Sequence, residues 1–343
     1  MNLKFIILLN FIFFPFLIKA QDINFSQFYE LPLLRNPSLA GMYKGGSRIS
    51  TAIRSQWASV SVPYFSQAVS ADMRFGISKN SDNYLALGLQ ITNDVAGDSK
   101  LGKLQFLPLL AFHKSLSSEK DMYLSIGFMG GPVQQRFDPT KLKFDDQFVN
   151  GAYSSSNPTQ QTFSNTAFTY LDGAVGLTFS NTFGNDIRFY VGAAFFHFTN
   201  PKVAFNKQND IVLNRKYVLN GGLSAPTSDY SKIILYADYF TQGGNRQAQG
   251  GFIYKHDLII VDDESLSISG GIIIRWNDID AIIPLIKLDR YKWGFGLSYD
   301  INTSKLHQAS QMRGGFELTF SFRDFLNINN NSTDKTRCPI SVY

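Results

Sequence analysis

Side chains that commonly carry out chemistry are few in this sequence and widely separated. The four histidines are His113, His197, His256 and His307, and none belongs to a His-Glu-x-x-His pattern. Cys338 is the only cysteine, so the chain has neither a paired-cysteine metal motif nor an intrachain disulfide. We therefore predict no metal site and no cofactor.

Two kinds of short pattern resemble catalytic or ligand-binding motifs without meeting their requirements. Residues 117–120 read Ser-Ser-Glu-Lys, the spacing used by β-lactamase-type enzymes, but they fall in an expected turn and the partner motifs are missing. Asp145-Asp146 and Asp262-Asp263-Glu264 offer the oxygen ligands that calcium prefers, yet neither matches an EF-hand loop. Solvated loop tips are the simpler interpretation. The sequence therefore predicts a protein that is not an enzyme.

The first residues of the chain predict export from the cytoplasm. Residues 1–4 carry a positive charge, residues 5–18 are almost entirely apolar, and Ala20 is a small residue at the expected cleavage point. We predict that residues 1–20 are a signal peptide. Without Lys4 and Lys19, 30 basic and 27 acidic residues remain, a net charge of +3. Such a slight excess does not predict nucleic acid as a partner.

The rest of the chain alternates like β-strands. After residue 20 no apolar run reaches the length of about 18 residues that a membrane-spanning helix needs. The even positions of 316–322 are Phe, Leu, Phe and Phe, and the odd positions of 317–323 are Glu, Thr, Ser and Arg. In a membrane barrel the apolar face would meet lipid and the polar face would line the interior. In a soluble sheet the apolar face would pack on a core.

Fourteen strand-like runs follow residue 46. They span residues 47–57, 64–76, 83–94, 101–114, 121–136, 167–181, 187–199, 215–225, 231–240, 246–258, 265–276, 281–288, 291–302 and 311–323. If the first run starts in the periplasm, every connection that returns there is short, whereas the opposite end contains the two longest gaps, 137–167 and 200–214. Short periplasmic turns with longer outer loops are typical of bacterial outer-membrane barrels.

We therefore predict an all-β protein: a transmembrane antiparallel β-barrel of about 14 strands over residues 47–323, surrounded by outer-membrane lipid. Pro32 and Asn36-Pro37 favour an irregular N-terminal segment over residues 21–46, on the periplasmic side or at the barrel mouth. Residues 324–343 are predicted to form a polar C-terminal tail in the periplasm. The even strand number places both termini on the periplasmic side.

Two stretches resemble a known family. Residues 25–41 read Phe-Ser-Gln-Phe-Tyr-Glu-Leu-Pro-Leu-Leu-Arg-Asn-Pro-Ser-Leu-Ala-Gly, and Arg54-Ser55-Gln56-Trp57 follows within residues 48–60. They are similar to the start of PorP/SprF-family proteins, which belong to the type IX secretion system of Bacteroidota. Arg337-Cys338-Pro339 is similar to the Cys-Pro ending of many members, although residues 340–343 extend beyond it.

The resemblance implies a function. Members are outer-membrane barrels that support secretion or cell-surface anchoring of cargo with a type IX C-terminal signal, such as a gliding-motility adhesin. The implied partners are that cargo and periplasmic components of the secretion machinery. An outer-membrane transport channel for small or hydrophobic solutes is the alternative, because fourteen strands can also enclose such a channel.

Seven residues are candidates for contact with a partner: Arg35, Asn36, Pro37, Gly41, Arg54, Trp57 and Arg74. The first four lie in a segment that acts either as a plug or docking element, or as a fixed turn that only closes the barrel. Five arginines are expected to point inward: Arg48, Arg54, Arg74, Arg136 and Arg188. They either hold an acidic partner segment or pair with Asp72, Asp238, Asp300 and Glu317 for stability. The sequence leaves both pairs of alternatives open.

Overall fold

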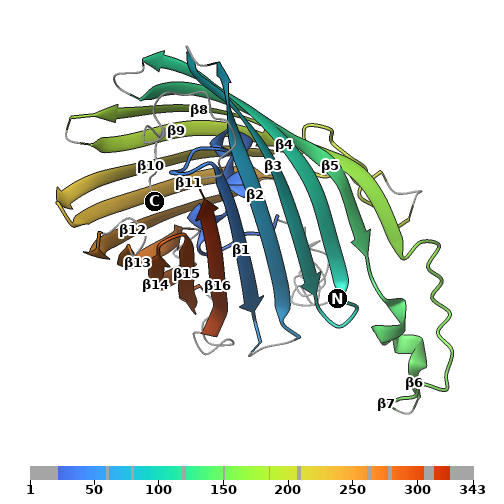
Figure 1. Cartoon of the computed structure of the whole chain (residues 1–343). Coiled ribbons are helices and arrows are strands. Elements are labelled where there is room, and N and C mark those ends of the chain that lie inside the picture. Colours follow the sequence, from blue (N-terminus) through green and yellow to red (C-terminus); the bar gives the residue numbers. More distant parts are fainter. Residues whose placement is uncertain are drawn as a thin grey trace, which may run out of the picture.

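Fourteen antiparallel strands close into a barrel in the computed structural model of the chain (Figure 1). The structure describes residues 22–58, 62–78, 81–117, 121–149, 151–184, 186–206, 210–260, 265–276, 280–304 and 313–324. The predicted signal peptide, residues 325–343 of the predicted tail with Cys338, residues 118–120, His307 and the acidic run 262–264 lie outside the described residues.

The barrel strands are β1 (Ser47–Gln56), β2 (Tyr64–Ser78), β3 (Ser81–Ala96), β4 (Leu101–Ser117), β5 (Met122–Arg136), β8 (Ala167–Phe183), β9 (Ile187–Phe196), β10 (Lys216–Ser228), β11 (Ser231–Gln242), β12 (Asn245–Ile259), β13 (Leu266–Trp276), β14 (Ala281–Arg290), β15 (Trp293–Asn302) and β16 (Arg313–Asp324). Each pairs with the next barrel strand, and β16 returns to β1. Closure satisfies the backbone hydrogen bonds that lipid cannot. The predicted fold class is confirmed. The expected run 187–199 ends earlier, because His197 has a φ of 59°, which interrupts the extended backbone.

The closing strands show which way the barrel faces. Arg54 of β1 lies opposite Glu317 of β16 in the ladder. Glu317 is 0% exposed, whereas its neighbours Phe316 and Leu318 are 42% and 46% exposed. The predicted pairing of the first and last strands is confirmed, and so is the outward direction of the apolar face.

The two ends of the barrel differ in their connections. We call the end where β1 begins and β16 ends the short-turn end; its connections include residues 229–230 and 291–292. At the opposite, long-loop end, residues 137–166 join β5 to β8 and residues 197–215 join β9 to β10. The first of these loops holds the 3₁₀ helices η3 (Pro139–Lys141) and η4 (Asp145–Gln147) and a hairpin of β6 (Phe148–Val149) and β7 (Ala152–Tyr153), which projects from the barrel (Figure 1).

Residues 22–46, which we call the plug, lie inside the barrel (Figure 1, blue). Three short helices shape the plug: η1 (Phe28–Glu30), α2 (Pro32–Arg35) and η2 (Pro37–Leu39). Proline occupies the first position of α2 and of η2, where its fixed φ suits a helix start. None of the helices in the described residues is long and apolar enough to cross a membrane.

The plug runs the length of the lumen. The Asp22 backbone N–H donates to Gln242, the last residue of β11 at the long-loop end. The Gly46 N–H donates to the carbonyl of Asp324, the last residue of β16 at the short-turn end. The expected position was the periplasmic side or the barrel mouth. The segment instead extends along the lumen from one end to the other, and the chain then returns as β1.

Candidate functional site

The plug and the lumen wall form one packed interior. From residue 25 to residue 43 every residue except Leu34 is buried. Phe28 and Tyr29 pack into a cluster with side chains from the wall, and the ring of Tyr29 stacks on that of Tyr236 with centroids 5.1 Å apart. Apolar contact of this kind holds the plug by the same hydrophobic effect that stabilises a soluble core.

Arg35 anchors the plug to the wall through a buried ion pair. Its Nη2 lies 2.5 Å from Oδ1 of Asp238, and its Nε donates to Oδ2 at 2.9 Å. Nη1 donates to the hydroxyl of Tyr190 at 2.7 Å, and the guanidinium lies 5.0 Å from the ring centroid of Phe28. Both charged side chains are buried. A bidentate pair with these additional contacts is the arrangement in which a buried charge is compensated.

Asn36 and Pro37 fit against glycines of the wall. The Asn36 Nδ2 lies 3.2 Å from the carbonyl oxygens of Leu177 and Ala193. Its Oδ1 accepts the N–H of Ser38 at 3.0 Å and so caps η2. A Cβ at Gly127 would lie 2.4 Å from the carbonyl carbon of Pro37. Glycine in β5 therefore leaves the room that the plug backbone occupies.

We predict that Gly127→Ala displaces residues 36–38 from the wall while the barrel still closes. The added methyl would meet plug backbone, which cannot rotate away as a side chain can. Trypsin cleavage at Arg35 in the detergent-purified protein measures the displacement, and cleavage should become faster than in wild type. Gly270→Ala is the matched control, because Gly270 lies in β13 with open space around its Cβ position. Equal resistance of both variants to trypsin would contradict the close fit.

A second anchor holds the plug near the short-turn end. Gly41 has a φ of +74°, a conformation that favours glycine, and its N–H donates to Oδ2 of Asp72 at 2.6 Å. Arg48 completes the site by donating to both carboxylate oxygens of Asp72 at 3.0 and 2.9 Å. The backbone N–H of Arg74 donates to the carbonyl of Gly46 at 3.0 Å.

A third anchor binds plug backbone to carboxylates of the wall. Glu317 accepts the N–H groups of Ser26 and Gln27 at 2.6 and 2.7 Å. Arg54 lies beside it, with Nη2 2.5 Å from Asp300 and Nε 3.8 Å from Glu317. The carboxylates of Glu317 and Asp300 therefore contact both Arg54 of the barrel wall and residues of the plug.

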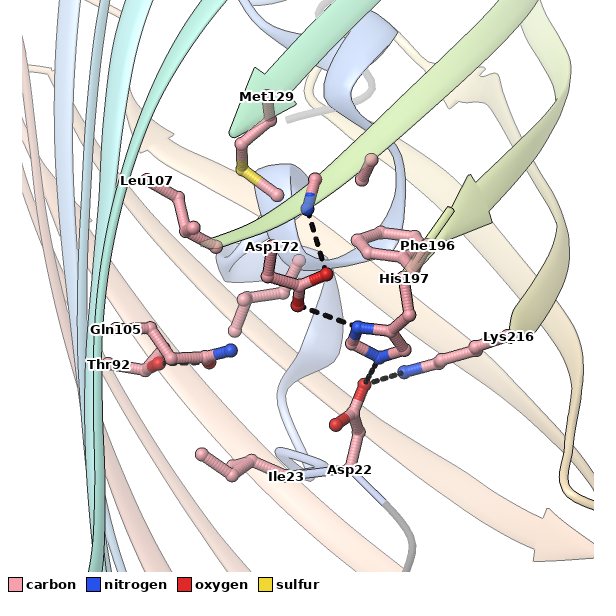
Figure 2. A pocket seen from close by; sticks show the side chains of 13 residues that line it. Asp22, Ile23, Thr92, Gln105, Leu107, Met129, Asp172, Phe196, His197 and Lys216 are labelled. Atoms are coloured by element: carbon pink, nitrogen blue, oxygen red, sulfur yellow. Dashed lines mark hydrogen bonds and ion pairs between the residues drawn. The ribbon is translucent and has the colours of Figure 1, made fainter. Parts of the chain in front are cut away.

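At the long-loop end Asp22 is surrounded by three basic side chains, two of which, His197 and Lys216, are drawn in Figure 2. Its carboxylate lies 3.0 Å from Lys103, 2.7 Å from Nε2 of His197 and 3.6 Å from Lys216. Nδ1 of His197 lies 2.7 Å from Asp172. Burial alone would lower the pKa of His197, but the carboxylates of Asp22 and Asp172 outweigh it and raise the pKa to about 9.

The contact between Asp22 and His197 should depend on pH. A histidine with a raised pKa contributes stability below its ordinary value of 6.5 and loses it as the pH rises through about 9. Burial by itself would raise the pKa of Asp22, but its basic neighbours hold it well below 3.8, so Asp22 loses its contribution only in acid. A nitroxide on Ile23→Cys, in a Cys338→Ser background, should be more mobile at about pH 10 than at about pH 7, although Lys103 still pairs with Asp22 at the higher pH. His197→Asn should abolish this change in nitroxide mobility with pH. A change that survives in the variant would contradict the assignment to His197.

The structure brings most of the seven predicted site residues to the plug and the wall beside it. It places Arg35, Asn36, Pro37 and Gly41 in the plug, Arg54 and Arg74 on strands β1 and β2, and Trp57 just after β1, where it shares a cavity with Arg54. Trp57 has a φ of 61° and lines a cavity of about 310 Å³ at the long-loop end with Tyr64, Arg275 and Asp280. Contact of these residues with a partner stays a prediction.

Several residues of the site were not predicted. They are Asp22, Glu30, Lys103, His197, Lys216 and Lys287, all of which join the plug to the wall. The alternation of the strands places Lys103 and Lys287 on inward faces, and this pattern could have identified them as lumen residues. No local pattern connects them to acidic residues of the plug.

The closed barrel with an apolar outer face and a polar, filled interior has the architecture of bacterial outer-membrane β-barrel proteins. Residues 17–322 match the model of the family described as type IX secretion system membrane protein PorP/SprF, so the chain belongs to that family. The suspected family is confirmed. No curated protein gives a significant match.

Solved structures with a similar fold are outer-membrane proteins. The toluene transporter TbuX from Ralstonia pickettii is 10% identical, with a TM-score of 0.45 over 85% of this chain and 93% of that chain. An outer-membrane channel from Pseudomonas putida F1 is 9% identical, with a TM-score of 0.40 over 88% of this chain and 99% of that chain. The translocator domain of autotransporter NalP from Neisseria meningitidis is 12% identical, with a TM-score of 0.35 over 87% and 95%. The likeness is confined to the barrel fold.

Proposed function

We propose that this chain is a non-enzymatic outer-membrane barrel of the type IX secretion system. It supports secretion or cell-surface anchoring of cargo with a type IX C-terminal signal, such as a gliding-motility adhesin. Membership of the PorP/SprF family over residues 17–322 is the observation that carries the proposal. The short-turn end and the C-terminal tail face the periplasm, in agreement with the usual sorting of loop lengths in such barrels.

The filled lumen supports a role as a partner of the secretion machinery rather than as a conduit for cargo. The plug is buried along the lumen and anchored to opposite sides of the wall by Asp238, Asp72 and Glu317. The cavity of about 310 Å³ at the long-loop end is the size of a small-molecule pocket and does not admit a folded domain. Cargo therefore contacts the long loops, and machinery components contact the short-turn end.

Deletion of the gene tests this function. Proteins released from intact cells by surface proteolysis are compared by mass spectrometry between wild type, deletion strain and complemented strain. We expect the deletion to remove at least one large protein with a type IX C-terminal signal from the surface and complementation to restore it. Normal display of every such cargo in the deletion strain would reject the function.

The transport alternative makes a different prediction. A hydrophobic solute would need an apolar path, whereas the cavity at the long-loop end is lined by charged groups that include Arg275, Asp280 and Asp300. Conductance in planar bilayers, or uptake of a small solute with cargo display intact in the deletion strain, would favour a channel. We expect neither while the plug is in place.

A further inference from the structure

Five basic side chains line the lumen wall near the short-turn end. We call them the basic arc: Arg188 of β9, Lys232 of β11, Lys255 of β12, Lys287 of β14 and Arg323 of β16. Each lies an even number of residues from a buried inward-facing side chain of its own strand, as Lys232 does from Tyr236 and Arg323 does from Glu317. Because side chains alternate along a strand, all five point into the lumen.

Three members of the basic arc share one carboxylate. One carboxylate, Asp289, lies 3.3 Å from Lys255, 3.3 Å from Lys287 and 3.1 Å from Arg323. Lys287 also pairs with Glu30 of the plug. Arg188 pairs at 2.6 Å with Asp186, whose side chain is 64% exposed, so water weakens that pair.

Lys232 is the least compensated member of the arc. Within the described part of the chain it forms no ion pair, and it lies directly opposite Lys255 in the ladder between β11 and β12. Among the described residues, the charged groups that act most strongly on it are the cations Lys255, Arg188 and Arg323 and the carboxylate of Asp257. Like charges opposite each other destabilise a sheet. The position therefore favours an anionic ligand that would contact Lys232 and Lys255 together.

The shape of the arc identifies the class of ligand. From β16 to β9 there are seven strand spacings of about 4.8 Å, so the arc extends over roughly 34 Å of wall. A single phosphate group contacts only one part of such a span. An extended polypeptide with a rise of about 3.3 Å per residue covers it with about ten residues and can present several carboxylates. The plug provides an example of such a contact, because the carboxylate of Glu30 pairs with Lys287 of the arc.

We propose that the basic arc binds an acidic segment of a protein on the periplasmic side of the outer membrane. This inference rests on the proposed function for its orientation, because only there does the short-turn end face the periplasm. The arc faces the lumen and not the lipid, so lipid headgroups are not its ligands.

The test uses the full chain purified in detergent and a fluorescein-labelled oligoglutamate of about ten residues, followed by fluorescence anisotropy. We expect saturable binding that weakens with salt. Lys232→Gln combined with Lys255→Gln should weaken binding about tenfold or more, as expected for loss of charge-assisted hydrogen bonds. Because the double variant removes a like-charge contact, it should keep the heat-modifiable migration of a folded barrel. Lys232→Arg with Lys255→Arg should retain binding.

Arg290→Gln is the matched control, because Arg290 is exposed and lies at the same end of the barrel, next to Asp289 but on the opposite face of β14. Absence of saturable binding, equal weakening by Arg290→Gln, or equal competition by inorganic phosphate or anionic lipid vesicles would overturn the proposal. Binding that appears only after Asp262, Asp263 and Glu264 are neutralised would also overturn it, because the chain would then supply its own ligand. Deletion of the gene could remove cargo from the cell surface while the Lys232 and Lys255 variants bind the probe normally. That result would overturn the proposal for the basic arc and leave the proposed function in place.

Discussion

Arg35→Met should release the plug from the wall and leave the barrel closed. The substitution removes the guanidinium that compensates Asp238, whose carboxylate would stay buried without its charged partner. Breaking a buried pair in this way costs about 3–5 kcal/mol. Hydrogen exchange followed by mass spectrometry should show loss of protection over residues 22–46, while heat-modifiable migration stays that of wild type.

A double variant separates the charge effect from simple loss of packing. Arg35→Met combined with Asp238→Leu replaces the whole pair with apolar side chains, which is often close to neutral in stability. Protection of the plug should therefore recover in large part. Unchanged protection in the single variant would show that the pair of Arg35 and Asp238 does not hold the plug.

Phe320→Arg should block assembly of the barrel in the outer membrane. Phe320 lies on the apolar face of β16, with its ring centroid 5.2 Å from those of Trp293 and Phe295 on β15. An arginine on the lipid-facing surface near the membrane midplane costs about 2–4 kcal/mol. Fractionation of cells and heat-modifiable migration measure the loss of assembled protein.

Phe320→Leu serves as the control, because leucine keeps an apolar side chain toward lipid. It should assemble like wild type. Normal assembly of Phe320→Arg would mean that the face of β16 with Glu317 meets the lipid, contrary to the burial of Glu317 in the lumen.

The barrel could be predicted from the sequence because alternation is a local property. Each strand displays its two faces within a few residues, as Phe316 to Arg323 does, and a one-residue error would expose Glu317 to lipid. Pairing of β1 with β16 then follows, because the backbone hydrogen-bonding groups at the edges of both strands need partners within the membrane. The hairpin of β6 and β7 was not predicted, because its strands contain only two residues each and carry no alternation.

The path of the plug could not be predicted in the same way. An irregular segment has no periodic pattern that fixes its position against a wall. Its contacts join residues far apart in the chain: Arg35 and Asp238 are separated by 203 positions, and Ser26 and Glu317 by 291. The inward carboxylates were recognised as partners for barrel arginines, and Arg54 does contact Asp300. Their second role, as acceptors for plug backbone, depends on three-dimensional structure alone.

The claim that this barrel works with its lumen filled is tested most directly by locking the plug to the wall. The hydroxyl oxygens of Ser38 and Thr178 lie 2.6 Å apart, so Ser38→Cys with Thr178→Cys, in a Cys338→Ser background, places two thiols within reach of a disulfide. The oxidised variant is expressed in the deletion strain, and surface display of type IX cargo is measured with and without reductant. We expect the locked protein to support the same display as wild type. Loss of display in the oxidised protein, with recovery on reduction, would contradict a role in which the plug stays in place.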